Sequence, residues 1–220
     1  MGVRSSQSKF YWATSLAIDA HKIKTLEAIE SKSVLEIGCA SGVDARQYSQ
    51  YASRYVGVDI SDEAIKNCQS LGLQNSEFLC VDGHALPFKS GQFQCVVVNS
   101  LLHHMDLEAV LPEIKRLLSK NGVLIFREPL GTNLAFQAYR FFTPRARTTD
   151  ERPFTFKDLK LLETHFDLKN AEWFGFLSIF SAFLPSERVR RLLTSIDTVL
   201  SHSPIKYFYW QFAGIAEVRY

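Results

Sequence analysis

Short apolar runs alternate along the chain with longer stretches in which apolar side chains recur every three or four residues. Five of the runs are typical of strands buried on both faces: residues 33–37, 55–60, 77–83, 93–100 and the last part of 116–129. The stretches at 10–29 and 107–118 have the spacing of amphipathic helices, and shorter helices fit at 43–50 and 61–72. Strands that alternate with helices predict an α/β domain with a mainly parallel sheet.

Local signals set the expected ends of several helices. Ser61 and Thr155 each precede a helical stretch as N-caps, and Asp158 stands three residues after Thr155, in the register of a capping box. Proline is tolerated at the first helical position, so Pro112 predicts that the regular part of its helix begins there, after a short turn. Asn121-Gly122 then predicts a left-handed C-cap.

Beyond residue 130 the strand and helix pattern is weaker. It predicts a helix at 132–142, a polar loop at 143–153, a sixth strand at 168–174, a helix at 186–200 and a last strand at 209–218.

The segment Val34–Gly42, VLEIGCASG, reads as a buried strand that runs into a glycine-bearing turn. The next strand ends at Asp59, about 20 residues further on. Such a turn brings bare backbone close to a ligand, and such an acid binds ribose hydroxyls, so the pair describes a nucleotide-type site. The dinucleotide fingerprint G-x-G-x-x-G is absent, which argues against a nicotinamide dehydrogenase.

The residues of these segments resemble the sequence motifs of the class I S-adenosylmethionine-dependent methyltransferases. Glu36, Gly38 and Gly42 match the family's E/D-x-G-x-G-x-G motif, with Ala40 in place of its middle glycine; alanine fits if the backbone does not need a positive φ there. Four more segments follow in the family's order, so the resemblance spans residues 30 to 130. They are EFLCVDG with ALPF, FQCVVVNS, LLHHM and RLLSKNGVLIFREP.

The resemblance implies a Rossmann-like, doubly wound, seven-stranded, mostly parallel sheet with an antiparallel last strand. It implies S-adenosyl-L-methionine as cofactor, with Glu36 anchoring the methionine amino end. The turn at Gly38, Cys39, Ala40 and Gly42 would pass close to the cofactor. The remaining positions implied are Asp59 with Ile60 at the ribose, Asp82 with Gly83 and His84 at the adenine, and Asn99 with Ser100 at the methionine side.

Catalytic candidates follow the fourth and fifth strands. His103 and His104 lie just after strand four, where a histidine could take a proton from a hydroxyl or amine, and His104 is the preferred base. The alternative is that LHH is a packing and helix-start feature. Glu128 is the second candidate, with a pair to Arg127 or a cap on the next helix as its alternative.

Composition restricts the function classes. The net charge of +2 offers no strong field for nucleic acid, and four cysteines without C-x-x-C spacing read as buried thiols of a reducing cytoplasm, with no metal site. The apolar run at 173–185 is too short for a membrane span, so stable membrane insertion is not expected.

The acceptor is narrowed by exclusion. Strand four continues Asn99-Ser-Leu-Leu, without the N/D-P-P-Y/F segment of nucleic-acid amino methyltransferases, and the acid sets of catechol-type and protein-arginine enzymes are missing. A small, partly apolar molecule is therefore expected. Its pocket would draw on aromatic residues: Phe136, Tyr139, Phe141, Phe142, Phe154, Trp173, Phe174, Phe176, Phe180 and Phe183. Arg145, Arg147 and Arg152 are better explained as a solvated loop paired with Asp150 and Glu151 than as an anion site.

The 220 residues are expected to form a single domain, as a monomer or homodimer. Within it, residues 1–30 would be a lid helix, 31–130 the cofactor-binding core, 131–208 a variable acceptor region and 209–220 the last strand. The leading function is methyl transfer to an oxygen or nitrogen of an organic small molecule. The alternatives are a lipid or quinone methyltransferase at a membrane surface and a non-catalytic S-adenosylmethionine-binding protein.

Overall fold

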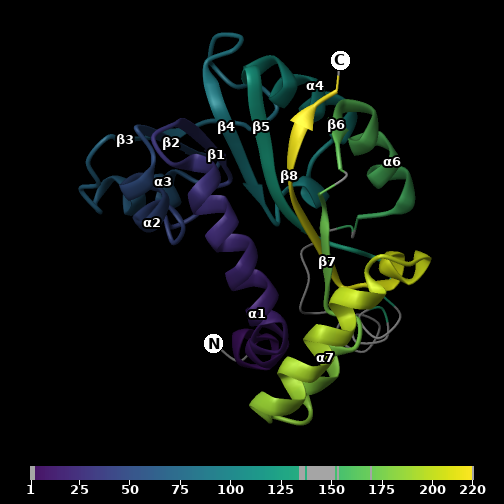
Figure 1. Ribbon diagram of the computed structural model, residues 1–220. Coiled ribbons are helices and arrows are strands. Elements are labelled where there is room, and N and C mark those ends of the chain that lie inside the picture. Colours follow the sequence, from purple (N-terminus) through teal and green to yellow (C-terminus); the bar gives the residue numbers. More distant parts are fainter. Residues whose placement is uncertain (1–2, 134–136, 138–151, 153, 169, 220) are drawn as a thin grey trace.

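A twisted sheet with helices on both faces forms the body of the protein (Figure 1). The computed structural model describes residues 3–133, 137, 152, 154–168 and 170–219, with side chains from residue 9 onward. Its strands are β1 (Ser33–Ile37), β2 (Arg54–Asp59), β3 (Ser76–Cys80), β4 (Phe93–Asn99), β5 (Leu118–Pro129), β6 (Phe166–Asp167), β7 (Glu172–Phe174) and β8 (Gln211–Val218).

The helices connect and cover these strands. The α-helices are α1 (Val3–Ile29), α2 (Ala45–Tyr51), α3 (Asp62–Gln69), α4 (Leu107–Leu117), α6 (Phe156–His165) and α7 (Glu187–Leu200). Short 3-10 helices are η1 (Leu102–His104), η3 (Ser178–Ala182) and η4 (Pro204–Phe208). No helix in the described part of the chain is long and apolar enough to cross a bilayer.

The strand order is β3-β2-β1-β4-β5-β8-β6, with β7 also paired to β8. The first five strands run parallel, and β8 is antiparallel to β5, which confirms the predicted fold class. The sheet has eight strands: β7 lies within the predicted sixth strand at 168–174, whereas β6, which precedes that range, was not predicted, and both pair with β8. A turn closed by a hydrogen bond from Ala171 N to Leu168 O separates these two strands.

Alternate side chains of each central strand enter different cores, because successive residues of a strand point to opposite faces. Leu35 and Ile37 of β1 pack in the core beneath α4 and α6, whereas Val34 packs with α1, α2 and α3. Burial on both faces explains why these strands read as nearly continuous apolar runs.

The capping signals of two helices are confirmed, and two other local expectations are wrong. The Ser61 side chain accepts from Ala64 N, and Thr155 with Asp158 forms a capping box. Helix α4, however, begins at Leu107 and carries Pro112 inside it. Pro112 lies on the exposed face of α4, so the carbonyl that loses its hydrogen bond there faces water.

The predicted left-handed C-cap at Asn121-Gly122 is also absent, because α4 passes directly into β5 at Leu118, which is extended. Gly122 lies in a crowded place: a Cβ there would be 3.0 Å from Leu118 Cδ2 and 3.1 Å from Ser119 N, so a side chain would require these neighbours to shift.

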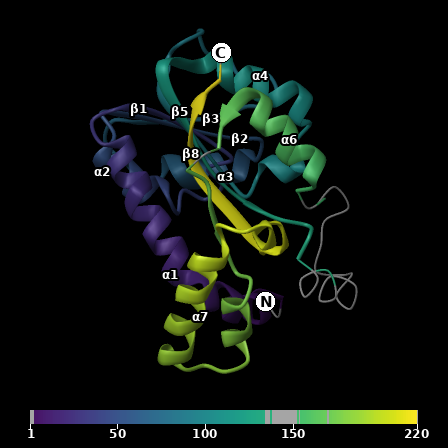
Figure 2. The same cartoon turned by 45° about the vertical axis from the view of Figure 1, so that its right-hand side comes forward.

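The first half of α1 lies against α7 and η3, away from the ends of β2 and β3 (Figures 1 and 2). The Phe10 and Phe183 ring centroids are 5.8 Å apart, and Tyr11 lies 5.6 Å from Trp210 by the same measure. Arg190 Nη1 donates to Trp12 O at 3.0 Å. That residues 1–30 act as a lid stays a prediction. In the structure, the first half of α1 is packed against α7 and η3.

Candidate active site

The turn after β1 has a left-handed backbone at alternate residues: φ is +79° at Gly38, +45° at Ala40 and +74° at Gly42. Gly38 N and Cys39 N both donate to Val58 O, which ties the turn to the end of β2. A Cβ on Gly38 would lie 2.7 Å from Leu101 Cδ2, so this glycine is required by space as well as by φ. The condition placed on Ala40 from the sequence is not met, because Ala40 does need a positive φ.

Ala40→Gly is therefore expected to stabilise the fold by about 1 kcal/mol. Removing a side chain from the left-handed region relieves about 1–2 kcal/mol of strain, and the greater conformational entropy that glycine loses on folding offsets part of this gain. Chemical denaturation of both proteins measures the difference. A lower unfolding free energy for the variant would show that the alanine methyl makes packing contacts that outweigh the backbone strain.

Asp59 joins this turn to the start of α3. Its Oδ2 accepts from Ala40 N at 2.9 Å, and its Oδ1 accepts from Ser61 N at 2.9 Å. A carboxylate has about four lone-pair sites, so each oxygen keeps capacity for a ligand hydroxyl. The carboxylate is half-buried and anchored at both oxygens, which fixes its direction at the carboxyl end of β2.

A pocket of about 320 Å³ opens at the carboxyl ends of β1 and β2. Seven of the residues that the sequence predicts line it: Gly38, Asp59, Ile60, Asp82, Gly83, His84 and His104. Sequence reasoning missed the apolar wall formed by Ile37, Val58, Val81, Leu101 and Met105. The alternation of β1 and β2 could have identified Ile37 and Val58, because both are the last core-facing residues of their strands.

The far rim of this pocket is a hydrogen-bonded loop beyond β3, which ends at Cys80, before Asp82. Asp82 Oδ1 accepts from His84 N at 2.9 Å and lies 2.8 Å from His84 Nδ1. His84 Nε2 accepts from Asp106 N, the N-cap residue of α4, at 3.2 Å. The bonds from His84 hold the pKa of Asp82 below its ordinary value, so this exposed carboxylate is ionised and acceptor-only at neutral pH.

Glu36 lies on the other side of β1 from the pocket. It is buried, and its carboxyl accepts a hydrogen bond from the Tyr55 hydroxyl. Burial raises the pKa of Glu36 to about 8, partly opposed by the Tyr55 bond. Asn99 Nδ2 donates to Tyr48 OH at 3.5 Å, and burial raises the pKa of Tyr48. Glu36, Cys39, Ala40, Gly42, Asn99 and Ser100 are thus outside the lining of the pocket.

The structure separates the three catalytic candidates. Glu128 is fully buried, and its Oε1 accepts from Leu101 N at 2.9 Å and Leu102 N at 2.8 Å. Its Oε2 lies 2.7 Å from Nδ1 of His103, which is also buried. Glu128 and His103 therefore hold the segment after β4 in place, a third arrangement beside the pairing and capping alternatives that the sequence left open.

His104 is the candidate that reaches the pocket, where it is half-buried. Its ring packs on that of His103 with 4.1 Å between centroids. The segment that carries it begins at Ser100, whose φ is +54° and whose N donates to Arg127 O at 2.7 Å. Strand end, backbone turn and the Glu128 contacts together aim His104 at the pocket.

The predicted aromatic acceptor region is only partly described. Phe154 and Phe174 are core residues, whereas Phe180 and Phe183 are exposed. Arg152 pairs with Asp158 at 2.9 Å. Trp173 and Phe176 are half-buried and pack against the core. The remaining predicted residues of this region lie outside the described part: Phe136, Tyr139, Phe141, Phe142, Arg145, Arg147, Asp150 and Glu151.

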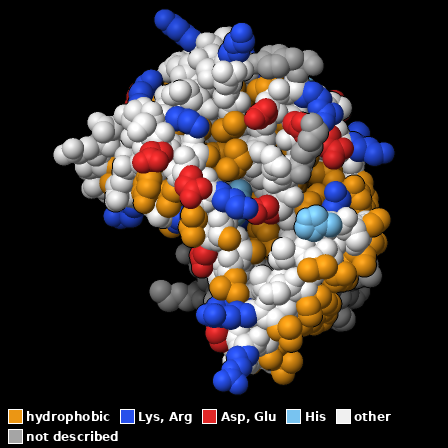
Figure 3. Space-filling view, in the orientation of Figure 1, with side chains coloured by type: hydrophobic (Ala, Val, Ile, Leu, Met, Phe, Trp, Pro, Cys, Tyr) orange, Lys and Arg blue, Asp and Glu red, His pale blue; other side chains and the backbone are white. Residues whose placement is uncertain are grey.

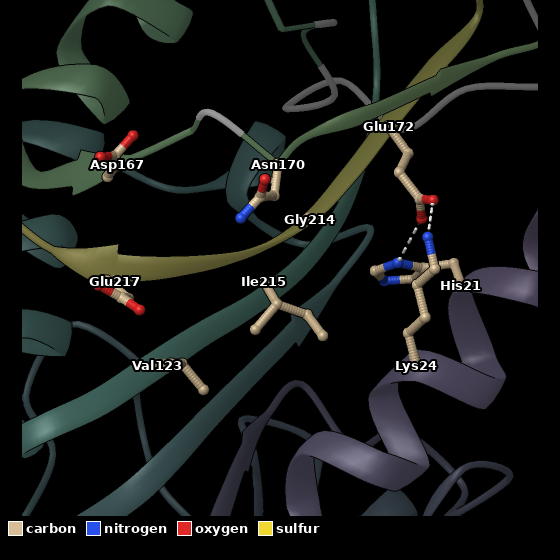
Figure 4. Close-up of a pocket in the computed structure, with 9 residues that line it drawn as sticks. All are labelled: His21, Lys24, Val123, Asp167, Asn170, Glu172, Gly214, Ile215 and Glu217. Carbon is tan, nitrogen blue, oxygen red and sulfur yellow. Dashed lines mark hydrogen bonds and ion pairs between the residues drawn. The ribbon is translucent and has the colours of Figure 1, made fainter. Parts of the chain in front are cut away.

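A larger cavity of about 480 Å³ lies between α1 and β8 (Figure 4). At one end Glu172 contacts Lys24 and lies 3.5 Å from His21 Nδ1. No residue predicted from the sequence lines it, and its floor is formed by Val123, Gly214 and Ile215, in the body of the strands. The smaller pocket is the candidate site, because ligands of such sheets bind outside the carboxyl ends of the strands.

Part of the chain matches a known family of proteins. Residues 35–126 match the family described as a methyltransferase domain. The chain is 30% identical over 105 residues to an uncharacterized methyltransferase, YcgJ of Bacillus subtilis, covering 46% of this chain and 42% of that protein. It is 24% identical over 116 residues to a ubiquinone biosynthesis O-methyltransferase of Bordetella parapertussis, covering 50% and 47%. The matches thus span less than half the length of these relatives.

Solved structures share the fold over most of the chain. The PH0226 protein of Pyrococcus horikoshii superposes with a TM-score of 0.64 at 16% identity, covering 93% of this chain and 91% of that one. The crystal structure of YcgJ gives a TM-score of 0.58 at 17% identity, covering 90% and 94%. The ordered motifs, the sheet and the matched domain lead to one conclusion: residues 35–126 form a methyltransferase domain, on a fold that the solved structures share.

Proposed function

We propose that this protein transfers a methyl group from S-adenosylmethionine to an oxygen or nitrogen of an organic small molecule. The observation that carries the proposal is one pocket that brings together two acids and the preferred base: Asp59, Asp82 and His104 all line it. S-adenosylmethionine supplies an electrophilic methyl group when bound, so the protein has to bind, orient and exclude water.

The binding roles follow from the bonds already present. Asp59 is held at both oxygens and retains lone pairs for the two ribose hydroxyls. Asp82 is ionised and exposed, as an acceptor for the adenine amino group requires. The apolar wall of Ile37, Val58 and Leu101 suits a purine ring. Glu36, Asn99 and the turn from Gly38 to Gly42 are assigned to the methionine end.

The catalytic role falls to His104 in this proposal, because it lines the pocket whereas His103 is paired with Glu128. His104 would take the proton from the acceptor hydroxyl or amine. His103 and Glu128 are then positioning residues that hold the segment carrying His104.

The acceptor is proposed to be a small and partly apolar molecule bound between the cofactor site and residues 131–208, with residues 1–30 as a lid. Three relatives have names that give an acceptor and oxygen as the methylated atom. They are the ubiquinone biosynthesis O-methyltransferase, a malonyl-[acyl-carrier protein] O-methyltransferase of Alcanivorax borkumensis and a protein-L-isoaspartate O-methyltransferase of Shewanella sediminis. These names favour oxygen as the methylated atom.

Incubation of the protein with methyl-labelled S-adenosylmethionine and a fractionated cell extract tests the proposal. We expect label to appear in a low-molecular-mass organic fraction. The matched control is His104→Ala, which should bind cofactor and transfer little label. Label in nucleic acid or protein alone, or cofactor binding without any transfer, would contradict the proposed function.

Cofactor binding is expected to release up to about one proton near pH 7, because the cofactor's ammonium group would favour ionised Glu36, whose pKa is about 8 in the free protein. Calorimetry in two buffers of different ionisation enthalpy measures this release. Glu36→Gln should abolish it. Equal proton release by the variant would remove Glu36 from the methionine site.

The same pKa predicts an effect on stability. The unfolded carboxyl ionises near pH 4.5 and the folded one near 8, so the native state binds the extra proton between these values. Stability should therefore fall as pH rises through this window. In Glu36→Gln that fall should be smaller, as thermal unfolding at pH 5 and pH 8 would show.

A further inference from the structure

Helix α7 buries two charged side chains on its inner face and exposes an apolar stripe on its outer face. Arg190 and Asp197 are buried on its inner face, with 8% and 2% of their surfaces exposed. Leu192, Ile196 and Val199 form one stripe on the outer face and are 61%, 37% and 73% exposed. A surface helix normally turns its apolar stripe inward, so this stripe requires an explanation.

The buried polar groups fix this orientation. Arg190 Nη1 donates to Trp12 O at 3.0 Å and to Ser15 Oγ at 2.6 Å. Asp197 accepts from Leu177 N at 2.7 Å and from Ser178 N and Oγ at 3.0 and 2.7 Å. Rotating α7 to bury the stripe would break these bonds and leave the buried groups that Arg190 and Asp197 satisfy without partners. The apolar stripe is therefore held outward.

A second exposed apolar group lies beside the stripe. It consists of Phe180 on η3, which is 49% exposed, and of Phe183 and Leu184 just after η3, which are each 61% exposed. The helix η3 contacts α7. We name the six side chains the α7 patch: Phe180, Phe183, Leu184, Leu192, Ile196 and Val199. Figure 3 shows hydrophobic side chains gathered along the lower right of the molecule, where Figure 1 places α7.

The charges around the α7 patch are mainly positive. Lys9 Nζ lies 4.9 Å from the Phe183 ring centroid, and Arg188 is exposed on α7. Arg191 is exposed as well and pairs with Glu187 at 2.9 Å. The remaining acid of α7, Asp197, is buried. An apolar strip with a basic rim is complementary to a lipid bilayer surface, which has an apolar acyl layer beneath anionic headgroups.

We propose that the α7 patch docks the protein on an anionic lipid surface. A helix of 14 residues with one apolar face suits the plane of the interface, where Leu, Ile, Val and Phe side chains enter the acyl boundary and Arg and Lys meet lipid phosphates. A second copy of the chain fits less well, because an isologous contact would bring the basic rims of both copies together.

Docking also suggests how the acceptor reaches the active site, an inference that rests on the proposed function. The carboxyl ends of β4 and β5 point toward the side of the molecule that carries α7 (Figure 1). A membrane-bound protein would thus turn its active-site edge toward the lipid, from which an apolar acceptor could enter.

The test uses the full chain and sedimentation with vesicles of phosphatidylcholine alone or mixed with phosphatidylglycerol. We expect binding to the anionic vesicles, weaker binding in high salt, and at least about a tenfold lower partition coefficient for Leu192→Gln/Ile196→Gln. The matched control is Ile23→Gln/Tyr51→Gln, which removes two side chains of 58% and 42% exposure away from the patch and should bind as the wild type does.

Several outcomes would overturn the proposal. They are no binding of the wild type to anionic vesicles, equal binding by the patch variant, or an equal loss in the control. A wild-type dimer that becomes monomeric in the patch variant, without vesicle binding, would instead make the patch an interface between copies. Far-ultraviolet circular dichroism and S-adenosylhomocysteine affinity of the variants separate lost docking from lost folding and from failure of the proposed methyl transfer.

Discussion

His104→Ala is expected to lower turnover by about 10² to 10⁴ while leaving cofactor affinity nearly intact. The reason is position: His104 is the catalytic candidate that lines the pocket, and its removal takes away the proton acceptor without touching Asp59 or Asp82. Single-turnover kinetics with the identified acceptor, together with calorimetry of S-adenosylhomocysteine, measure the two quantities separately.

His103→Ala is the comparison that gives this experiment its meaning. His103 is buried against Glu128, with 2.7 Å between Nδ1 and Oε2, so its loss should cost roughly 1.5–3 kcal/mol of stability. We expect a lower melting temperature for His103→Ala and an unchanged one for His104→Ala. The roles would be reversed, and the assignment wrong, if His104→Ala unfolded easily and kept full turnover.

Asp59→Ala should weaken S-adenosylmethionine binding by roughly 10- to 150-fold, equivalent to about 1.5–3 kcal/mol for bonds to a charged group. The variant loses the acceptor for the ribose hydroxyls. It also loses the bonds from Ala40 N and Ser61 N, which hold the glycine turn and the start of α3. The loss should therefore appear mainly in affinity, with a smaller decrease in stability.

Asp62→Ala supplies the control for calorimetry. Asp62 is the neighbouring exposed acid on α3, where it pairs with Lys66 at 2.5 Å. Its removal changes the net charge equally but should leave affinity within about twofold, because surface ion pairs contribute little. Equal affinities for wild type and Asp59→Ala would exclude Asp59 from the ribose site.

The sequence predicted the parts of the structure in which local and tertiary signals agree. The strand at 33–37 and the cap at Ser61 follow directly from hydrophobic pattern and side-chain chemistry, and both are confirmed. The ordered motifs also predicted seven of the pocket residues, because parallel strands bring their carboxyl ends to one edge.

The features that could not be predicted depend on packing between distant segments. Nothing in the local pattern shows that Glu128 binds Leu101 N, Leu102 N and His103, because these groups meet only when β4 and β5 pair. The orientation of α7 is of the same kind, since Arg190 donates to Trp12 and Ser15, which lie far away in sequence. The start of α4 was mispredicted for a different reason. The free-energy cost of a proline inside a helix depends on whether the carbonyl that loses its hydrogen bond faces water, and the sequence does not show this.

A crystal structure with S-adenosylhomocysteine is the most direct test of the central claim, that the pocket at the ends of β1 and β2 is the cofactor site. We expect the ribose hydroxyls at the carboxylate of Asp59, the adenine amino group at Asp82 and the homocysteine end beside Asn99, with His104 facing the sulfur. A ligand bound elsewhere, for example in the cavity between α1 and β8, would contradict the account.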